Sequence, residues 1–329
     1  MTKILKSRHL IYVLIGIGLA ILPWLNQAGF VRSATVTTFG MIIFYAIAAL
    51  GLNVLLGYSG LVSLGTAGFM GLSAYLTTHF TNTMGMSFWF SLPLAIIIPV
   101  VLGLLVGLVS LRLEGMYLAI ATLAVAEVLR QVFIEIWSFA SLRPPQPDIF
   151  VRFLQRDGTY RLLVIFLVVL MILTDNFIHS PIGRAFLTMR ASEPAAQAMG
   201  INLIKYKLMA FGLATTYAAV AGILYAHFIR AVSPDPWTLL MSLQILAVIV
   251  IGGFKTITGP LVGSFIVFGV PPLILNRLPV ISDIAGLPFI FNGVLIIVVI
   301  LFYPRGLVFI VHDVKRLLMK ATNKKEVTS

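Results

Sequence analysis

The side chains best suited to chemistry or recognition gather in one segment, from Pro181 to Lys207, of a 329-residue chain that is otherwise largely apolar. The segment reads PIGRAFLTMRASEPAAQAMGINLIKYK and carries a single acid, Glu193, among four basic residues: Arg184, Arg190, Lys205 and Lys207. Charges of this kind, on a stretch that interrupts apolar sequence, suit the docking of another protein.

A short helix is predicted at the centre of this segment. Ser192 can cap its N-terminus, and Pro194 is tolerated in a first turn, where amide hydrogens lack helical partners. Gly200 can take the left-handed conformation that closes a helix. The helix would run from about Glu193 to Met199, roughly 10 Å at ~1.5 Å per residue, which is too short to span a membrane but long enough to be gripped by a partner.

Residue types that support catalysis are few. The chain has no cysteine, and its five histidines are scattered without ligand spacing, so we expect no metal site. No paired carboxylates and no convincing Ser/His arrangement are found, which argues against an intramembrane enzyme. The glycine cluster GGFKT at 252–256 lacks the order of a P-loop. We therefore expect no cofactor on this chain and no ATPase site of its own.

The composition indicates an all-α polytopic membrane protein. Hydrophobic residues make up 60% of the chain and charged residues 10%, far from the proportions of a soluble domain. From Ser33 to Leu111 there is no charged residue, and such a run must form successive helices because the bilayer core offers no water to unpaired backbone groups. The apolar stretches are continuous rather than alternating, which disfavours a β-barrel.

Apolar runs of about 20 residues predict ten spans, at 10–26, 36–56, 60–80, 90–110, 115–137, 160–178, 208–229, 239–254, 259–276 and 287–304. If the N-terminus is cytoplasmic, the segments on the cytoplasmic side of the membrane carry 15 Lys and Arg residues and those on the outer side carry 7. This asymmetry favours an N-in, C-in orientation. The net charge of +12 is then explained by basic ends that meet anionic lipid, not by nucleic acid. A cleaved signal peptide is the alternative interpretation of the first span.

These predictions give one transmembrane domain over residues 1–329. The cytoplasmic loop 181–207 lies within it, and residues 315–329 form a basic cytoplasmic tail. The connection from His227 to Leu240 is broken by proline, and its Trp237 is expected at the membrane interface.

Two glycine-dense stretches stand out, LGLNVLLGYSGLVSLGTAGFMG and IGGFKTITGPLVGSFIVFGVPP. Glycine lets helices pack closely in lipid, and it also permits unwound segments that line a pathway. Within the fifth predicted span, Glu127 and Arg130 lie three residues apart and can neutralise each other on one helix face. Asp175 near the end of the sixth span is the other charge at depth, and ionisable groups there are functional candidates by default.

Several stretches resemble the permease subunits of ATP-binding cassette (ABC) importers for branched-chain amino acids, specifically the LivM type. In chain order, the resemblance is carried by LNVLLGYSGLVSLGTAGFMGLSAY, LRLEGMYLAIATLAVAEVLRQVF, GRAFLTMRASEPAAQAMGINLIKYKLMAFGLATTYAAVAGILYAHF, IGGFKTITGPLVGSFIV and LFYPRGLVFIV. Together they cover most of the chain from Leu50 to Val311.

The resemblance implies partners and a mechanism. In such importers a short cytoplasmic helix with an E-A-A, three residues, then G pattern docks into a groove on the ATPase subunit. Here Ala195, Ala196 and Gly200 match that spacing, while Pro194 stands where the pattern has Glu and Glu193 comes one position earlier. The residues implied in ATPase coupling are Arg190, Ser192, Glu193, Pro194, Ala195, Ala196, Ala198 and Gly200.

The implied assembly contains a second homologous permease, two ATPase subunits that carry ATP and Mg, and an extracytoplasmic substrate-binding protein, in the bacterial inner membrane. ATP binding would drive alternating access in the paired permeases. Candidates for the translocation path are polar residues on otherwise apolar segments: Asn53, Tyr58, Ser59, Ser63, Thr66, Tyr117, Thr122 and Gln244.

Two other transport functions remain as alternatives. A urea or amide permease of the same superfamily would share the coupling helix, although GINLIKYKLMAF is closer to the amino acid branch. An ion-coupled secondary transporter should carry more mid-membrane carboxylates than Glu127 supplies, and its transport should survive removal of the ATPases.

Overall fold

The computed structural model describes residues 2–110, 115–137, 155–274, 286–303 and 306–308, and in these ranges every regular element is helical. The elements follow in chain order as α1 (Thr2–Ala20), α2 (Leu22–Gln27), α3 (Ser33–Leu52), η1 (Asn53–Tyr58), α4 (Thr66–Asn82), α5 (Phe88–Ser110), α6 (Met116–Trp137), α7 (Gln155–Ile178), α8 (Pro181–Ala191), α9 (Glu193–Ala198), α10 (Leu203–Ile229), α11 (Leu239–Gly252), α12 (Gly259–Ser264), η3 (Phe265–Gly269), α13 (Val270–Leu273) and α14 (Leu287–Phe302). The elements η1 and η3 are π-helices.

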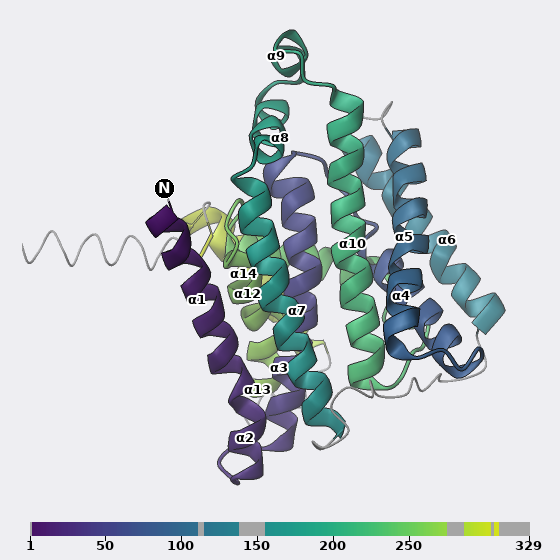
Figure 1. The fold of residues 1–329 in the computed structure, drawn as a ribbon, viewed down its shortest axis with the longest axis vertical. Helices are drawn as coiled ribbons and strands as arrows, with labels where there is room; N and C mark the ends of the chain where they lie inside the picture. The colour runs from purple at the N-terminus through teal and green to yellow at the C-terminus, as the bar shows by residue number, and fades with distance from the viewer. Residues whose placement is uncertain (1, 111–114, 138–154, 275–285, 304–305, 309–329) are drawn as a thin grey trace, which may run out of the picture.

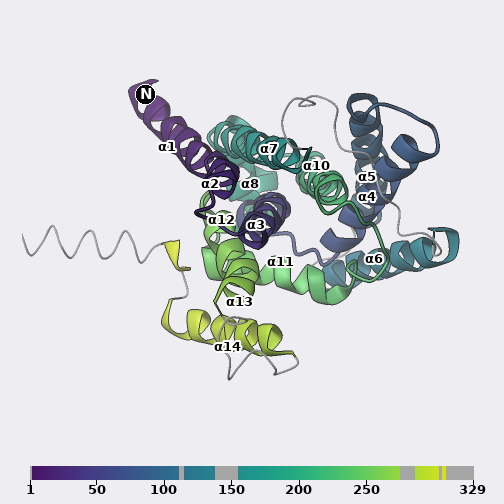
Figure 2. The ribbon, with the colours of Figure 1, turned by 90° about the horizontal axis from the view of Figure 1, so that it is seen from below.

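Helices α3 and α10 form the centre of the bundle, and the other long helices surround them (Figure 2). The most apolar window of α3 is 78% buried and that of α10 is 61% buried, against 17% for the α1 span and 22% for α5. Because lipid tails solvate exposed apolar side chains, the outer helices need not cover their faces. The predicted all-α membrane architecture is thus confirmed.

Glycines let the central helices approach one another closely. Gly51 of α3 faces Tyr217 of α10, and Gly222 of α10 lies against the backbone of Met70 in α4, where a Cβ would overlap the Met70 carbonyl. Small residues at such crossings bring helix backbones together in membranes. The packing role predicted for glycine is therefore present in α3 and α10.

The two ends of the bundle are marked by contacts between distant parts of the chain. At one end Arg8 Nη1 lies 2.7 Å from His179 Nε2, and the Tyr58 hydroxyl donates to the Lys255 carbonyl over 2.6 Å. Helices α8 and α9 project from this end (Figure 1). At the opposite end Gln27 Nε2 donates to Asp157 Oδ2 over 2.6 Å. The start of α1 therefore shares an end with the polar segment that contains α9.

Six helices in the described ranges are long and apolar enough to cross a membrane: Arg8–Gln27, Ser33–Tyr58, Phe88–Val109, Met116–Glu135, Asp157–Ile178 and Leu203–Ile229. The remaining predicted spans correspond to shorter helices, namely α4 with 17 residues and the apolar stretches Leu239–Gly252, Gly259–Leu273 and Ile290–Val299. The count of ten spans and their orientation stay predictions. The basic tail at 315–329 lies outside the described residues.

The structure differs from the prediction in two details. The third predicted span was to begin at residue 60, but α4 begins at Thr66 and residues 60–65 are not helical. Gly60 has a φ of 80°, a conformation that suits glycine and interrupts a helix. Trp237 does not face the surroundings as an interfacial anchor would, because only 1% of it is exposed and its ring packs edge-to-face on Tyr225 at 4.9 Å; its depth in the membrane stays a prediction.

Candidate coupling helix and substrate route

The polar segment folds as two short helices rather than the one predicted. Helix α8 is capped by Ser180, whose hydroxyl accepts from the Ile182 amide over 3.2 Å, and it has Pro181 in its first turn. One face of α8 is buried through Gly183, Ala185, Phe186 and Met189. The exposed face carries both arginines of the helix, Arg184 and Arg190, so α8 packs on the bundle as an amphipathic helix.

Helix α9 follows after a single residue. Ser192 is extended, with φ −162° and ψ 116°, so it ends α8 and caps α9 at once, and its hydroxyl accepts from the Ala195 amide over 3.3 Å. At the other end Gly200 has a φ of 80°, and its amide donates to the Gln197 carbonyl over 2.9 Å. The predicted cap, first-turn proline and glycine terminator are therefore all seen in the structure, with the helix ending at Ala198.

Helix α9 presents most of its surface outward. Ala196 is fully buried, whereas Pro194, Ala195, Ala198 and Gly200 are exposed. A protruding helix with small exposed side chains at one end of the molecule (Figure 1) leaves room for a partner surface to come close to its backbone.

Glu193 is engaged within the chain. The ammonium group of Lys207, at the start of α10, lies 2.7 Å from both carboxylate oxygens of Glu193. The Lys207 side chain is only 8% exposed and that of Glu193 is 34% exposed. This partly buried ion pair fixes the start of α9 against α10, a connection that the sequence did not reveal because the pair is 14 residues apart.

A cavity of about 540 Å³ lies beside α9. Its walls come from α9, the start of α10, Gly115 before α6 and the non-helical stretch at residues 60–62. Glu193 and Lys207 both line it. Helix α9 therefore shares a cavity with the unwound segment that precedes α4.

Arg190 joins the polar segment to the centre of the bundle. Its Nη1 donates to the carbonyl oxygen of Gly57 in η1, and a Cβ at Gly60 would meet the Arg190 side chain. The side chain thus turns inward along α8 instead of pointing only toward a partner. A guanidinium that donates to a backbone carbonyl makes a charge-assisted hydrogen bond.

Both glycine-dense stretches contain a π-helix followed or preceded by an unwound segment. In the first, η1 leads into residues 59–65, which are not helical, and in the second, the turn at 253–258 leads through α12 into η3. Segments of π-helix are rare and often occur at functional sites. Regular α-helix is therefore interrupted in both stretches, while their role in lining a pathway stays a prediction.

Asn53 and Tyr58 tie these two stretches together. Asn53 Nδ2 donates to the Thr256 carbonyl over 2.8 Å, and its Oδ1 accepts from the Lys255 amide over 3.2 Å. Tyr58 holds the Lys255 carbonyl. Lys255 has a φ of 60°, which is unusual for a residue with a Cβ. Three hydrogen bonds from η1 thus hold this turn in a strained backbone conformation.

Side-chain hydroxyls accept from backbone amides of the unwound stretch and of the first turn of α4. The Leu64 amide donates to the Thr122 hydroxyl of α6 over 3.0 Å, and the Ala67 amide donates to Ser242 of α11 over 3.1 Å. Ser63 accepts from the Gly65 amide over 3.3 Å. Since buried amides must find acceptors, α6 and α11 together complete the N-terminus of α4. Ser242 was not among the predicted residues.

The predicted pathway residues thus divide into two groups. One lies around the break, which is the non-helical stretch of residues 59–65 between η1 and α4, and the other two residues lie apart from it. Asn53, Tyr58, Ser59, Ser63, Thr66 and Thr122 are all buried within or beside the unwound stretch. Ser59 donates back to the Leu55 carbonyl over 2.5 Å. By contrast, Tyr117 is 72% exposed on α6, and Gln244 is half-buried on α11. Since the hydrogen bonds of the buried group run to backbone of the same chain, these side chains position the backbone at the break.

Glu127 and Arg130 form the predicted pair on α6. Arg130 Nη2 lies 2.5 Å from Glu127 Oε1, with side chains 27% and 52% exposed respectively. The pair lies on an exposed face rather than in a buried site. In the described ranges no cluster of His, Asp and Glu is arranged to hold a metal ion.

Comparison with known proteins places this geometry in a family. Residues 34–303 match the family model described as the branched-chain amino acid transport system / permease component, and the chain belongs to this family. It is 29% identical over 87% of its length, and 71% of the relative's, to the high-affinity branched-chain amino acid transport system permease protein LivM of Salmonella typhimurium.

The Escherichia coli LivM protein shows the same identity and coverage. A probable branched-chain amino acid transport permease protein LivM of Methanocaldococcus jannaschii is 25% identical over 70% of this chain and 73% of the relative. No solved structure showed a significant match to the chain.

Proposed function

We propose that this chain is a membrane-embedded permease subunit of an ABC importer that carries leucine, isoleucine and valine into the cytoplasm. The observation that carries the proposal is α9, a doubly capped helix that projects from the bundle and is linked to the unwound stretch at 59–65. Family membership and the names of the relatives supply the substrate class.

The assembly we propose contains a second homologous permease, two ATPase subunits that hold ATP and Mg, and an extracytoplasmic substrate-binding protein. Helix α9 docks on an ATPase, and closure of the ATPase pair moves α9 together with the Glu193–Lys207 ion pair and α8. Arg190 then carries this motion to η1. The unwound segments change the side to which the central path opens, as in alternating access.

The orientation we propose places α9 and both termini in the cytoplasm of a bacterial inner membrane, with ten spans. Several basic residues lie at the α9 end, which agrees with positive-inside placement. The chain lacks cysteine, so single cysteines give a clean test. Thr2→Cys and Gln197→Cys should react with an impermeant maleimide only in inside-out vesicles, and Thr83→Cys only in right-side-out cells.

Reconstituted transport tests the function. The chain is purified with its partner subunits, reconstituted in vesicles and supplied with binding protein and radiolabelled leucine. ATP-dependent leucine uptake that valine and isoleucine inhibit, and urea does not, supports the proposal. Uptake of urea in place of leucine identifies the urea or amide permease, and leucine uptake that persists without ATPases but collapses with an ionophore identifies a secondary transporter.

A further inference from the structure

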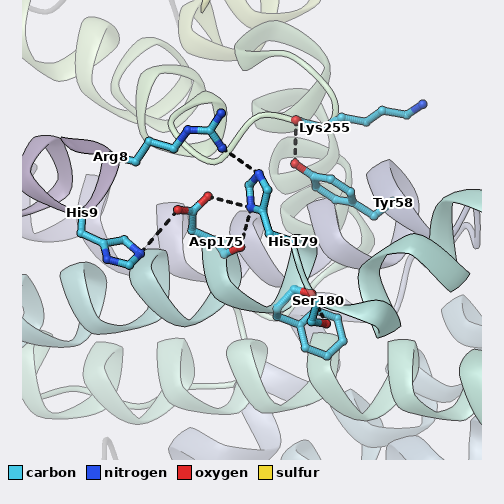
Figure 3. A network of polar contacts seen from close by, with 8 residues as sticks. Arg8, His9, Tyr58, Asp175, His179, Ser180 and Lys255 are labelled. Atoms are coloured by element: carbon cyan, nitrogen blue, oxygen red, sulfur yellow. Dashed lines mark hydrogen bonds and ion pairs between the residues drawn. The ribbon is translucent and has the colours of Figure 1, made fainter. Parts of the chain in front are cut away.

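A second polar site lies at the α9 end of the bundle, separate from the cavity beside α9. It is a cavity of about 390 Å³ between α1, the end of α7, η1 and the 253–258 turn. Figure 3 shows its polar side chains, with Asp175 between His9 and His179 and with Arg8 reaching His179. This volume is within the range of small-molecule sites, roughly 300–1,000 Å³.

Asp175 forms the buried acidic part of the cavity. The residue is 1% exposed, and neither carboxylate oxygen receives a hydrogen bond from the described residues. Two histidines lie within ion-pair distance of the carboxylate: His179 Nδ1 is 3.2 Å from Oδ1, and His9 Nε2 is 3.6 Å from Oδ2. A buried carboxylate is costly unless donors satisfy it, so this group is suited to receive a ligand cation.

The rim of the cavity carries the opposite charge. Arg8 and Lys255 are exposed and line the same cavity. Between the acid and the rim, the walls are formed by Ile11, Ile178 and Ile257 together with a tyrosine, Tyr12. A ligand that fits this pattern has an ammonium group, a carboxylate and an aliphatic body, which is the chemistry of an apolar α-amino acid.

His179 shows how such a ligand can be held. Its Nε2 accepts from Arg8 over 2.7 Å, and its Nδ1 lies 2.7 Å from the Asp175 carbonyl and 3.2 Å from the carboxylate. With hydrogen on Nδ1, the ring donates to the main-chain carbonyl of Asp175 at a point 3.2 Å from its carboxylate, and its Nε2 accepts from Arg8. An amino acid offers the same polarity, with its ammonium as donor and its carboxylate as acceptor. The His179 side chain is 48% exposed and has room to leave.

We infer that this cavity binds a free aliphatic amino acid, with its ammonium on Asp175, its carboxylate on Arg8 and its side chain among the three isoleucines, and that His179 occupies the head-group position when the site is empty. The choice of leucine as ligand, and the exposure of the site to the cytoplasm, rest on the proposed function. Because the site opens beside η1 and the 253–258 turn, product that accumulates in the cytoplasm would bind in this cavity and slow further import.

Binding of radiolabelled leucine to the purified assembly in nanodiscs, without ATP or binding protein, tests the site. Asp175→Asn and Arg8→Gln should each weaken leucine binding about tenfold, because each removes a charge-assisted contact. His179→Ala removes the internal competitor and should tighten binding several-fold. Charge-matched controls at the opposite end, Glu135→Gln and Arg32→Gln, should leave binding unchanged.

Two leucine analogues separate the two halves of the site. Wild type should bind leucine in preference to 4-methylpentanoate, which lacks the ammonium, and to leucinamide, which lacks the carboxylate. Asp175→Asn should lose only the first preference and Arg8→Gln only the second. Equal leucine binding by wild type and Asp175→Asn, or weaker binding by a correctly folded His179→Ala, overturns the proposal and leaves Asp175 as a structural partner of the two histidines.

Transport measurements keep this test distinct from that of the function. Wild-type vesicles preloaded with leucine on the α9 side should take up leucine several-fold more slowly than empty vesicles, and Asp175→Asn should remove most of this inhibition. If wild type shows no ATP-driven leucine uptake at all, the proposed function fails. If uptake proceeds but leucine binding is independent of Asp175, only the site fails.

Discussion

Arg190 of α8 donates a hydrogen bond to the carbonyl oxygen of Gly57, in the π-helix that precedes the break before α4. The two residues are 133 positions apart in sequence, and they connect the segment that carries α9 with the glycine-dense centre of the bundle. Gly57 in turn is followed by Tyr58, which holds the 253–258 turn. The Arg190 and Tyr58 side chains thus form a continuous link from α8 through η1 to the 253–258 turn.

Arg190→Gln should uncouple ATP hydrolysis from import. The shorter neutral amide cannot reproduce the charge-assisted bond, so α8 moves without pulling η1, and we expect leucine uptake per ATP hydrolysed to fall about tenfold. Uptake and ATPase rate are measured on the same vesicles.

Arg184→Gln is the matched control for this variant. Arg184 is exposed on the same helix and is not the residue bound to Gly57, so its removal changes the charge of α8 and leaves the inward contact in place. If the two variants impair uptake equally, Arg190 acts through surface charge on the ATPase and not through Gly57.

Gly200→Val should weaken the docking of α9. The residue has a φ of 80°, although a Cβ there would meet no atom within 4 Å, so the penalty comes from the backbone and not from crowding. A left-handed conformation costs a residue with a Cβ about 1–2 kcal/mol. This cost lowers the equilibrium constant for forming the native C-terminus of α9 roughly tenfold. We expect ligand-stimulated ATPase activity and uptake to fall together.

Gly200→Asn provides the control, since asparagine accepts the left-handed conformation at helix ends. This variant should retain most of the activity. If valine and asparagine are equally harmful, the ATPase needs the absence of a side chain at Gly200 and not its backbone conformation.

The Glu193–Lys207 pair should stabilise the position of α9 on α10. In a double-mutant cycle of Glu193→Gln and Lys207→Gln, we expect each single change to lower ATPase stimulation. The double variant should lose less stimulation than the sum of the two single losses. The reason is that each single change leaves one charge without its partner, and a partly buried pair is worth about 1–2 kcal/mol. Strictly additive effects would show that Glu193 acts on the partner ATPase instead of on Lys207.

Gly222→Ala should destabilise the core. The new methyl group would overlap the Met70 carbonyl and the Ser73 hydroxyl where α10 crosses α4, and overpacking of this kind costs about 1–3 kcal/mol or more. Thermal unfolding in detergent, followed by tryptophan fluorescence, measures the loss. Gly212→Ala on the same helix is the control, because its Cβ would make only an ordinary 3.4 Å contact with Leu104; an equal loss there would mean that helix α10 tolerates no methyl group anywhere.

Local signals in the sequence predicted much of this structure, and long-range pairing accounts for what they missed. Ser192, Pro194 and Gly200 defined α9 correctly because capping depends on residues within one or two turns. The central helices were found because a bilayer admits few other structures for long apolar runs. By contrast, the break at residues 60–65 and the first turn of α4 depend on Thr122 and Ser242, which lie on α6 and α11 and accept from the Leu64 and Ala67 amides.

The same limit applies to the candidate pathway residues. Polarity within an apolar segment singled out Asn53 and Tyr58, but it did not show whether they face substrate or backbone. Their hydrogen-bond partners lie about 200 residues away, at Lys255 and Thr256. Burial and pairing in three dimensions were needed to show that these side chains hold a turn.

Asn53→Asp should therefore lower import without changing its selectivity. The aspartate keeps an acceptor for the Lys255 amide but loses the donor to the Thr256 carbonyl, and its charge then faces that carbonyl oxygen. Loss of one buried hydrogen bond with an unsatisfied partner costs about 1–3 kcal/mol, so the 253–258 turn should no longer be held in place. We expect the maximal uptake rates of leucine and valine to fall by the same factor, about tenfold, in vesicles. Gln244→Glu, an amide-to-acid change on a half-buried residue of α11, is the comparison and should have a smaller effect. A shift in the leucine-to-valine ratio in Asn53→Asp would instead identify Asn53 as a substrate contact, because only a group that touches the side chain can distinguish one methylene.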